Sequence, residues 1–247
     1  MKKLLLLSGA LLLMSVAAAS ASVLNIAWTN CVGDAGATDK TFACNTNNGN
    51  ATAVLSFTPP TGGIPQMSGA EAYVYVATSN GSAALPLWWS MFNAGTCRAS
   101  ALTANASIPS SAANCFDAWN AQAGVAGIAA YNMTWNGPGT ALIDCAAAVP
   151  PSQLQSLDDA SEWFLFNVKI AYTGTVGPTC PGCSNPACLY FAKLDVSQPV
   201  GVGDFHMTAS GPRTFATWQG GGVGLPGCPG ATPTNNKSWG QLKSLYR

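Results

Sequence analysis

The sequence predicts an all-β fold, an antiparallel β-sandwich of the jelly-roll or Ig-like kind that is stapled by disulfides and carries one or two short helices. Short segments of alternating polar and apolar residues recur along the chain, and Gly, Pro, Asn and Ser separate them. About ten such segments without an internal repeat are typical of a two-layered sandwich. Nine cysteines behind an export leader supply the disulfides.

The leader is interpreted as a signal peptide at residues 1–21. Two lysines precede an apolar run at residues 4–16, and an Ala-Ser-Ala sequence ends at Ala21, as a signal peptidase requires. This run is shorter than the roughly 20 residues of a spanning helix, and no later segment is long and apolar enough. We therefore expect a mature chain that starts at Ser22, has no membrane span, and is secreted to the extracellular space or cell surface, with the periplasm as the alternative.

Residues 22–225 are predicted to form one β-sandwich domain. The clearest strand lies at residues 162–172, where apolar side chains alternate with Asn167 and Lys169. The same reasoning predicts further strands at residues 24–28, 53–58, 72–78, 87–92, 127–135, 141–146, 190–196, 205–209 and 214–218.

Two short helices are expected beside the strands. Asn114 is a good N-cap for a helix at residues 115–123, and Gly124 ends it. Residues 226–247 are predicted to be a linker followed by a helix at residues 238–246, whose apolar residues recur every third position. This helix either packs on the sandwich or projects as a docking tag.

The nine cysteines are expected to form disulfides, and one thiol must be left free, buried or paired with another chain. They are Cys31, Cys44, Cys97, Cys115, Cys145, Cys180, Cys183, Cys188 and Cys228. Spacing favours the local pairs Cys31–Cys44 and Cys97–Cys115. The cluster at residues 180–188 is interpreted as a Gly/Pro turn that disulfides join to Cys145 or Cys228.

A zinc site is the alternative for this cluster, because a CxxC pair with Cys188, Cys228 or His206 would offer four ligands. A structural zinc site normally shows a second CxxC pair, and the sequence has none. We therefore predict no metal and no cofactor.

Charge excludes nucleic acid as a partner. The chain has 10 Lys and Arg against 10 Asp and Glu, and only 8% of its residues are charged. Such a chain has no basic surface for a phosphate backbone. A high apolar content of 48% excludes intrinsic disorder as well.

Few residues can carry catalysis, so we predict that the protein is not an enzyme. His206 is the single histidine, and its neighbour Asp204 is interpreted as a strand partner rather than a catalytic one. Glu71 and Glu162 are the two glutamates, and each opens a predicted strand. No G-x-S-x-G elbow is present.

Tryptophans are the candidate binding residues. Trp88, Trp89 and Trp135 could present rings for sugars, although large aromatics also fill sandwich cores. We expect a non-enzymatic structural, surface or binding component whose partner is a glycan or another extracellular protein. A carbohydrate-binding module that uses these tryptophans is the alternative, and a glycoside hydrolase is a third reading.

Four segments resemble a group of secreted bacterial proteins that contain cysteines and end in Trp-Gly-x-x-Lys-x-Leu-Tyr-Arg. The segments lie at residues 42–47, 94–98, 200–204 and 236–247. The resemblance implies an exported, disulfide-stabilised bacterial domain. It implies no activity, ligand or catalytic residue.

Overall fold

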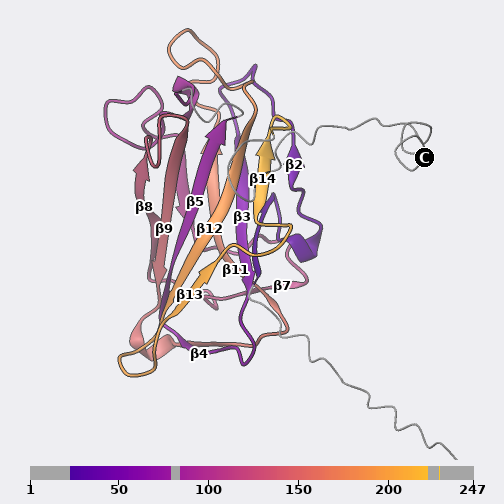
Figure 1. Cartoon of the computed structure of the whole chain (residues 1–247), viewed down its shortest axis with the longest axis vertical. Coiled ribbons are helices and arrows are strands. Elements are labelled where there is room, and N and C mark those ends of the chain that lie inside the picture. The colour runs from indigo at the N-terminus through magenta and orange to yellow at the C-terminus, as the bar shows by residue number, and fades with distance from the viewer. Residues whose placement is uncertain (1–22, 79–83, 222–227, 229–247) are drawn as a thin grey trace, which may run out of the picture.

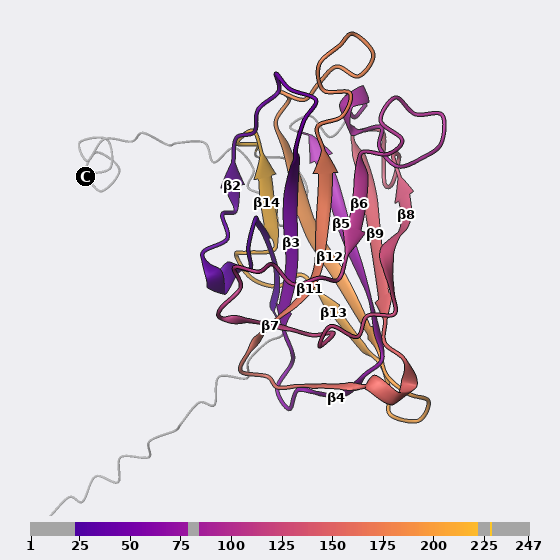
Figure 2. The ribbon, with the colours of Figure 1, turned by 180° about the vertical axis from the view of Figure 1, so that it is seen from behind.

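The computed structural model describes residues 23–78, 84–221 and 228, and in them two β-sheets pack face to face. Strands of the larger sheet, β8, β9, β5, β12 and β13, lie in front in Figure 1, and Figure 2 brings β3, β11 and β6 of the other sheet forward. The predicted all-β sandwich is confirmed. The helices of the described residues are short 3-10 turns, η1 (Val32–Asp34), η2 (Leu87–Trp89) and η3 (Pro151–Gln153).

Sheet A, the smaller main sheet, follows the order β1-β3-β11-β6, and β7 also pairs with β11. Its strands are β1 (Val23–Trp28), β3 (Asn50–Thr58), β6 (Leu102–Asn105), β7 (Cys115–Asp117) and β11 (Glu162–Ala171). The β7–β11 pair is parallel and the other pairs are antiparallel.

Sheet B follows the order β2-β14-β12-β5-β9-β8, and β13 also pairs with β12. Its strands are β2 (Asp39–Lys40), β5 (Gly69–Thr78), β8 (Val125–Asn132), β9 (Thr140–Ala148), β12 (Ala187–Ser197), β13 (Phe205–Thr208) and β14 (Phe215–Trp218). A separate two-stranded sheet joins β4 (Ile64–Met67) to β10 (Gln155–Leu157).

Alternation along the strands builds the core between the sheets. In β5, Val74 and Val76 are fully buried in the core, whereas Tyr73 and Tyr75 are half-buried on the other face. Strand β11 buries Phe166, Val168 and Ile170 in the same way. The period-2 pattern therefore identified these strands correctly, because each sheet buries one face and leaves the other to solvent.

Two predicted elements are wrong. Residues 87–92 are not a strand, because Leu87–Trp89 form a 3-10 turn after Pro86. Residues 115–123 are not a helix, because Cys115–Asp117 pair with Glu162–Phe164 of β11. Cys115 and Trp119, which lie four residues apart, are buried against the sandwich without forming a helical face.

Four disulfides stabilise the described chain, and they join residues that are far apart in sequence. The pairs are Cys31–Cys115, Cys44–Cys183, Cys97–Cys180 and Cys188–Cys228. The expected local pairs Cys31–Cys44 and Cys97–Cys115 are therefore wrong. The turn at residues 180–188 is joined by disulfides as expected, but Cys180 and Cys183 pair with Cys97 and Cys44, and Cys188 alone reaches Cys228.

Cys145 is the free thiol, and it is fully buried in the core. Burial raises the pKa of this thiol far above its usual value, so it stays protonated and inert. The other eight cysteines are oxidised, so the cluster at residues 180–188 has no thiolate to offer zinc. Such a set of disulfides indicates folding in an oxidising space, extracellular or periplasmic.

Among the described residues, no helix is long and apolar enough to cross a bilayer. The expected signal peptide at residues 1–21 and the expected helix at residues 238–246 lie outside the described residues.

Candidate functional site

The predicted tryptophan platform is wrong for two of its three residues. Trp88 and Trp89 are fully buried, because η2 turns both rings into the core where they contact Trp218. Trp135 is 38% exposed in the loop after β8. The described residues therefore offer no coplanar pair of exposed tryptophans, and a saccharide would need other rings.

The two glutamates lie on different sheets and form no catalytic pair. Glu162 opens β11, and its carboxylate accepts hydrogen bonds from the side chains of Asn25 and Ser56 and from the main-chain N–H groups of Val32 and Gly33. These bonds fix the loop after β1 to sheet A. Glu162 is therefore a structural residue. A cluster of Cys31, Cys115 and Glu162 has metal-ligand spacing, but both sulfurs are already in a disulfide.

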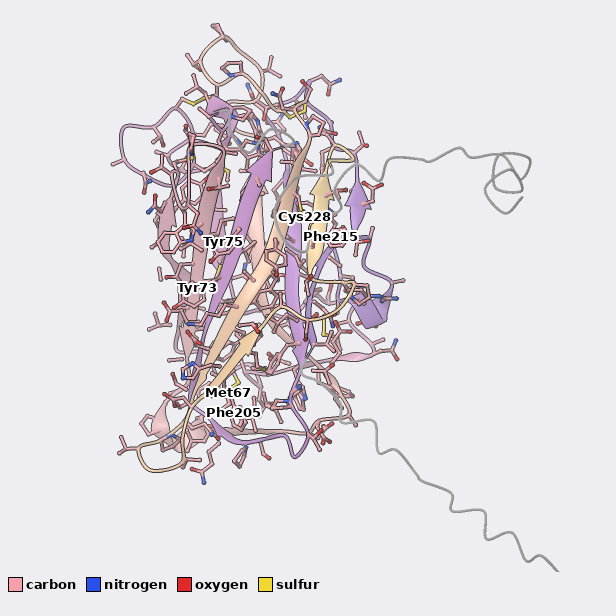
Figure 3. All side chains as sticks on the ribbon, in the orientation of Figure 1. Met67, Tyr73, Tyr75, Phe205, Phe215 and Cys228 are labelled. Carbon is pink, nitrogen blue, oxygen red and sulfur yellow. A yellow bond between two sulfur atoms is a disulfide. The ribbon has the colours of Figure 1, made fainter. Side chains whose placement is uncertain are left out.

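Half-buried tyrosines and carboxyl groups, together with the buried Asp144, gather instead on the outer face of sheet B, which we name the tyrosine–carboxyl face. Its members are Glu71, Tyr73, Tyr75, Asp144, Tyr190 and Asp195. Strand register brings them together, because Glu71 lies opposite Asp195, and Tyr73 lies opposite Asp144. Figure 3 shows Tyr73 and Tyr75 on this face, with Phe215 and Cys228 further along it.

Two tyrosines provide the aromatic part of this face. Tyr75 of β5 and Tyr190 of β12 are cross-strand partners, and their ring centroids are 6.3 Å apart with planes at 42°. Phe215 packs beside Tyr190 and the Cys188–Cys228 disulfide. Both tyrosine rings keep an exposed part, so a flat apolar ligand face could stack there.

Asp195 anchors the charged part of the face. Its two carboxylate oxygens bind Lys193 Nζ at 2.6 Å and His206 Nδ1 at 2.7 Å. Burial opposes ionisation of this carboxyl, but the hydrogen bonds from Lys193 and His206 outweigh it and hold the pKa of Asp195 below its usual value. His206 thus pairs with Asp195 and not with Asp204, whose carboxylate accepts from the main-chain N–H of Gln198.

Asp144 is the most perturbed carboxyl group of the chain. It is 9% exposed, and its Oδ1 is buried without a hydrogen-bond partner among the described residues. Burial, the adjacent Glu71 and the charge of Asp195 raise the pKa of Asp144 to about 7. Asp144 can therefore carry a proton near neutral pH.

We expect the domain to lose stability as the pH rises from about 4 to about 8. The pKa of Asp144 is about 7 in the folded chain and about 4 in an unfolded one. Between these values the folded state holds a proton that the unfolded state has lost, so the stabilisation is full below pH ~4 and lost as the pH passes ~7. A difference of about three pKa units would correspond to about 4 kcal/mol. Because solvent screens part of this interaction, we expect a loss of about 1–2 kcal/mol, or about 2–8 °C in Tm.

Thermal melts across this pH interval test the assignment. Asp144→Asn has no proton to lose, so its Tm should vary less with pH than that of the wild type. Asp204→Asn is the matched control and should keep the wild-type pH dependence. An Asp144→Asn protein that follows the wild-type curve would contradict the assignment.

Sequence reasoning found Glu71 and His206 but missed Asp144, Tyr73 and Tyr75. Each missed residue lies on the polar side of a correctly predicted strand, so alternation alone places it on the outer face. What sequence could not show is that β9, β5 and β12 are neighbours, which brings the three carboxyl groups together.

Comparisons with known proteins add no functional information. No protein-family model and no curated protein matches this chain. One similar solved structure has the description "Complete structure of manganese lipoxygenase of Gaeumannomyces graminis and partial structure of zonadhesin of Komagataella pastoris". It aligns at 8% identity with a TM-score of 0.26, over 80% of this chain and 48% of that chain. This chain thus spans about half the length of that structure, and so low a TM-score supports no argument about function.

Proposed function

We propose that the chain is a secreted, non-enzymatic binding domain whose tyrosine–carboxyl face binds a saccharide. The observation that carries the proposal is that Tyr75 and Tyr190 share one sheet face with Asp144, Glu71 and Asp195, which lie further along the same neighbouring strands. Sugar rings present apolar C–H faces that stack on aromatic rings and hydroxyl groups that donate to carboxylates. The unpartnered Oδ1 of Asp144 is one acceptor that a ligand hydroxyl could satisfy after a small side-chain rotation.

Several features support a binding role over a purely structural one. Lys193 and His206 hold the Asp195 carboxylate in place, and strand pairing fixes the backbone positions of Glu71 and Asp144, so this part of the face is organised before a ligand arrives. Burying carboxyl groups together lowers stability, and Asp144 is the clearest case because one of its oxygens is unsatisfied. Residues that lower stability are often retained for function.

A glycan array with the mature chain, residues 22–247, tests the proposal. We expect a defined glycan to be retained, and Tyr75→Ala and Tyr190→Ala each to weaken its binding by about tenfold, as the loss of a stacked ring does. Phe116→Ala is the matched control, because it removes an exposed ring that lies in sheet A, and it should bind as the wild type does.

Thermal melts would show that the tyrosine variants are folded. Retention of no glycan by the wild type, or equal retention by the folded Tyr75→Ala and Tyr190→Ala proteins, would contradict the proposal.

A glycoside hydrolase is the second candidate, and the raised pKa of Asp144 is the observation that favours it. A general acid works best when its pKa lies near the working pH, and Asp144 with a pKa of about 7 beside Glu71 meets that condition. Incubation of the retained glycan separates the two functions. Release of reducing ends by the wild type but not by Asp144→Asn would identify an enzyme, whereas an intact glycan supports the binding domain.

A further inference from the structure

A groove of about 580 Å³ lies on the outer face of sheet A, away from the tyrosine–carboxyl face. We name it the lysine groove. Strands β3 and β11 form its floor, and the segments at residues 40–43 and 109–111 form its walls. In Figure 2, β3 and β11 lie side by side on the face turned toward the viewer. Its volume is within the roughly 300–1,000 Å³ of small-ligand sites.

The residues that line the groove carry positive charge, whereas the described residues as a whole carry more acidic than basic side chains. Among the described residues, ten are acidic and five are basic. These five are Lys40, Arg98, Lys169, Lys193 and Arg213. Lys40 and Lys169 line the groove, and no carboxylate does.

Both groove lysines are available to a ligand. Lys40 Nζ donates to Thr29 Oγ1 at 3.1 Å, and neither Lys40 nor Lys169 forms an ion pair with a described residue. Lys193, by contrast, is neutralised by Asp195, and the Arg98 guanidinium is buried against Trp88. An anion that enters the groove therefore meets two ammonium groups without displacing a carboxylate.

Neutral hydrogen-bonding groups surround these lysines. Thr52 lies opposite Lys169 on the floor, and its hydroxyl donates to Asn50 Oδ1 at 3.0 Å. Asn167 is 7% exposed, and its amide nitrogen donates to the carbonyl of Ser107 at 2.6 Å, while its Oδ1 is buried without a partner among the described residues. Amides and hydroxyls of this kind both donate to and accept from sugar hydroxyl groups.

Packing and hydrogen bonds hold the Phe42 wall of the groove in place. Phe42, in the wall, stacks on the buried Trp218 with ring centroids 4.2 Å apart. The Gln219 side chain forms two hydrogen bonds with the main chain of Phe42. It accepts from Phe42 N and donates to Phe42 O, both at 3.0 Å. The disulfide Cys44–Cys183 closes the wall two residues later. Such preorganisation lowers the entropy cost of binding.

We propose that the lysine groove is a second binding site, independent of the tyrosine–carboxyl face, and that it takes an acidic saccharide of the uronic-acid class. Carboxylates of the sugar chain would pair with Lys40 and Lys169, and its hydroxyl groups would bond Asn50, Thr52 and Asn167. The half-buried ring of Tyr172 lines the same groove and offers a stacking surface.

Calorimetric titration of the mature chain with an oligogalacturonate and with its fully methyl-esterified form tests this site. The acid form should bind and the neutral ester should bind at least about tenfold more weakly. Lys40→Gln and Lys169→Gln should each lower the affinity for the acid form by about fivefold. Raising the salt concentration should reduce the difference in affinity between the acid form and the ester. Arg213→Gln is the matched control, because it removes one exposed positive charge that does not line the groove, and it should bind as the wild type does.

Three results would overturn the proposal. The first is that the acid form does not bind, and the second is that acid and ester bind equally. The third is that inorganic phosphate competes at concentrations equal to those of the sugar carboxylates, because such competition would indicate a site for any anion. The Tyr75→Ala and Tyr190→Ala proteins should keep this binding. The two sites can therefore fail separately, since loss of array binding in the tyrosine variants and loss of uronate binding in the lysine variants report on opposite sheets.

Discussion

Replacement of Arg98 by methionine is expected to destabilise the domain by about 3 kcal/mol and to lower its Tm by about 6–12 °C. Arg98 is 2% exposed. Its guanidinium donates to the main-chain carbonyls of Trp88, Ala171 and Thr173, and the last bond, from Nε, is 2.8 Å long. Burial lowers the pKa of Arg98 to about 10, but the group remains charged at neutral pH.

The effect is large because the three carbonyls belong to segments connected with both sheets of the sandwich. Ala171 ends β11 of sheet A, and Trp88 lies in η2 of the connection that follows β5 of sheet B. The guanidinium also lies 3.7 Å from the centroid of the Trp88 ring, which adds a cation–π contact. Methionine keeps an unbranched apolar stem but has no donors, so it would leave three buried acceptors unsatisfied at the end of the sandwich.

Two further variants show whether the hydrogen bonds are responsible. Arg98→Lys keeps the charge but has only a single donor group, so its Tm should lie between those of the wild type and of Arg98→Met. Arg213→Met removes an exposed arginine and should change the Tm by less than about 2 °C. An Arg98→Met protein as stable as Arg213→Met would contradict the role given to the three carbonyls.

The local alternation of polar and apolar residues predicted most strands of the sandwich. It failed where the structure of a segment depends on pairing with a strand far away in the sequence. In β11, Phe166, Val168 and Ile170 alternate with Asn167 and Lys169, and a strand with one face in the core is the simple outcome. Cys115–Asp117 are only three residues long, and their conformation depends on the parallel partner β11. A segment so short has no periodicity of its own, so its spacing misleads.

The predicted disulfide pairs were wrong for the same reason. Spacing favoured Cys31 with Cys44, but the parallel pairing of β2 with β14 brings Cys44 to Cys183 across 139 residues. The pairing of β7 with β11 likewise brings Cys115 to Cys31. Connectivity follows strand order, which the local pattern does not contain.

The candidate sites were predictable only in part. Alternation places Glu71, Tyr73 and Asp144 on outer faces, but their closeness depends on β9 lying beside β5. Lys40 and Lys169 come from segments that the sequence separates by more than a hundred residues, and the fold unites them in one groove. The adjacent Trp88 and Trp89 were misassigned, because a strand would have exposed one ring, whereas the 3-10 turn buries both.

Replacement of Trp218 by alanine is expected to cost about 3–5 kcal/mol, the range for a large aromatic deleted from a packed core. Trp218 is fully buried in β14, and its ring contacts Trp28, Phe42, Trp88, Trp89 and Tyr172. Its indole N–H donates to the carbonyl of Cys183 at 2.7 Å, which fixes the turn at residues 180–188. The cavity left by the deleted indole ring would therefore lie where both sheets and this turn meet.

The consequence should reach the lysine groove, because Trp218 is the surface on which Phe42 stacks. We expect a folded Trp218→Ala protein to melt about 6–20 °C lower than the wild type and to bind oligogalacturonate more weakly, although Trp218 does not line the groove. Trp135→Ala removes a tryptophan that is 38% exposed in a loop, and it should leave both measurements unchanged. If Trp218→Ala lost stability but bound the oligogalacturonate as tightly as Trp135→Ala does, the packing of Phe42 on Trp218 would not be what holds the groove in shape.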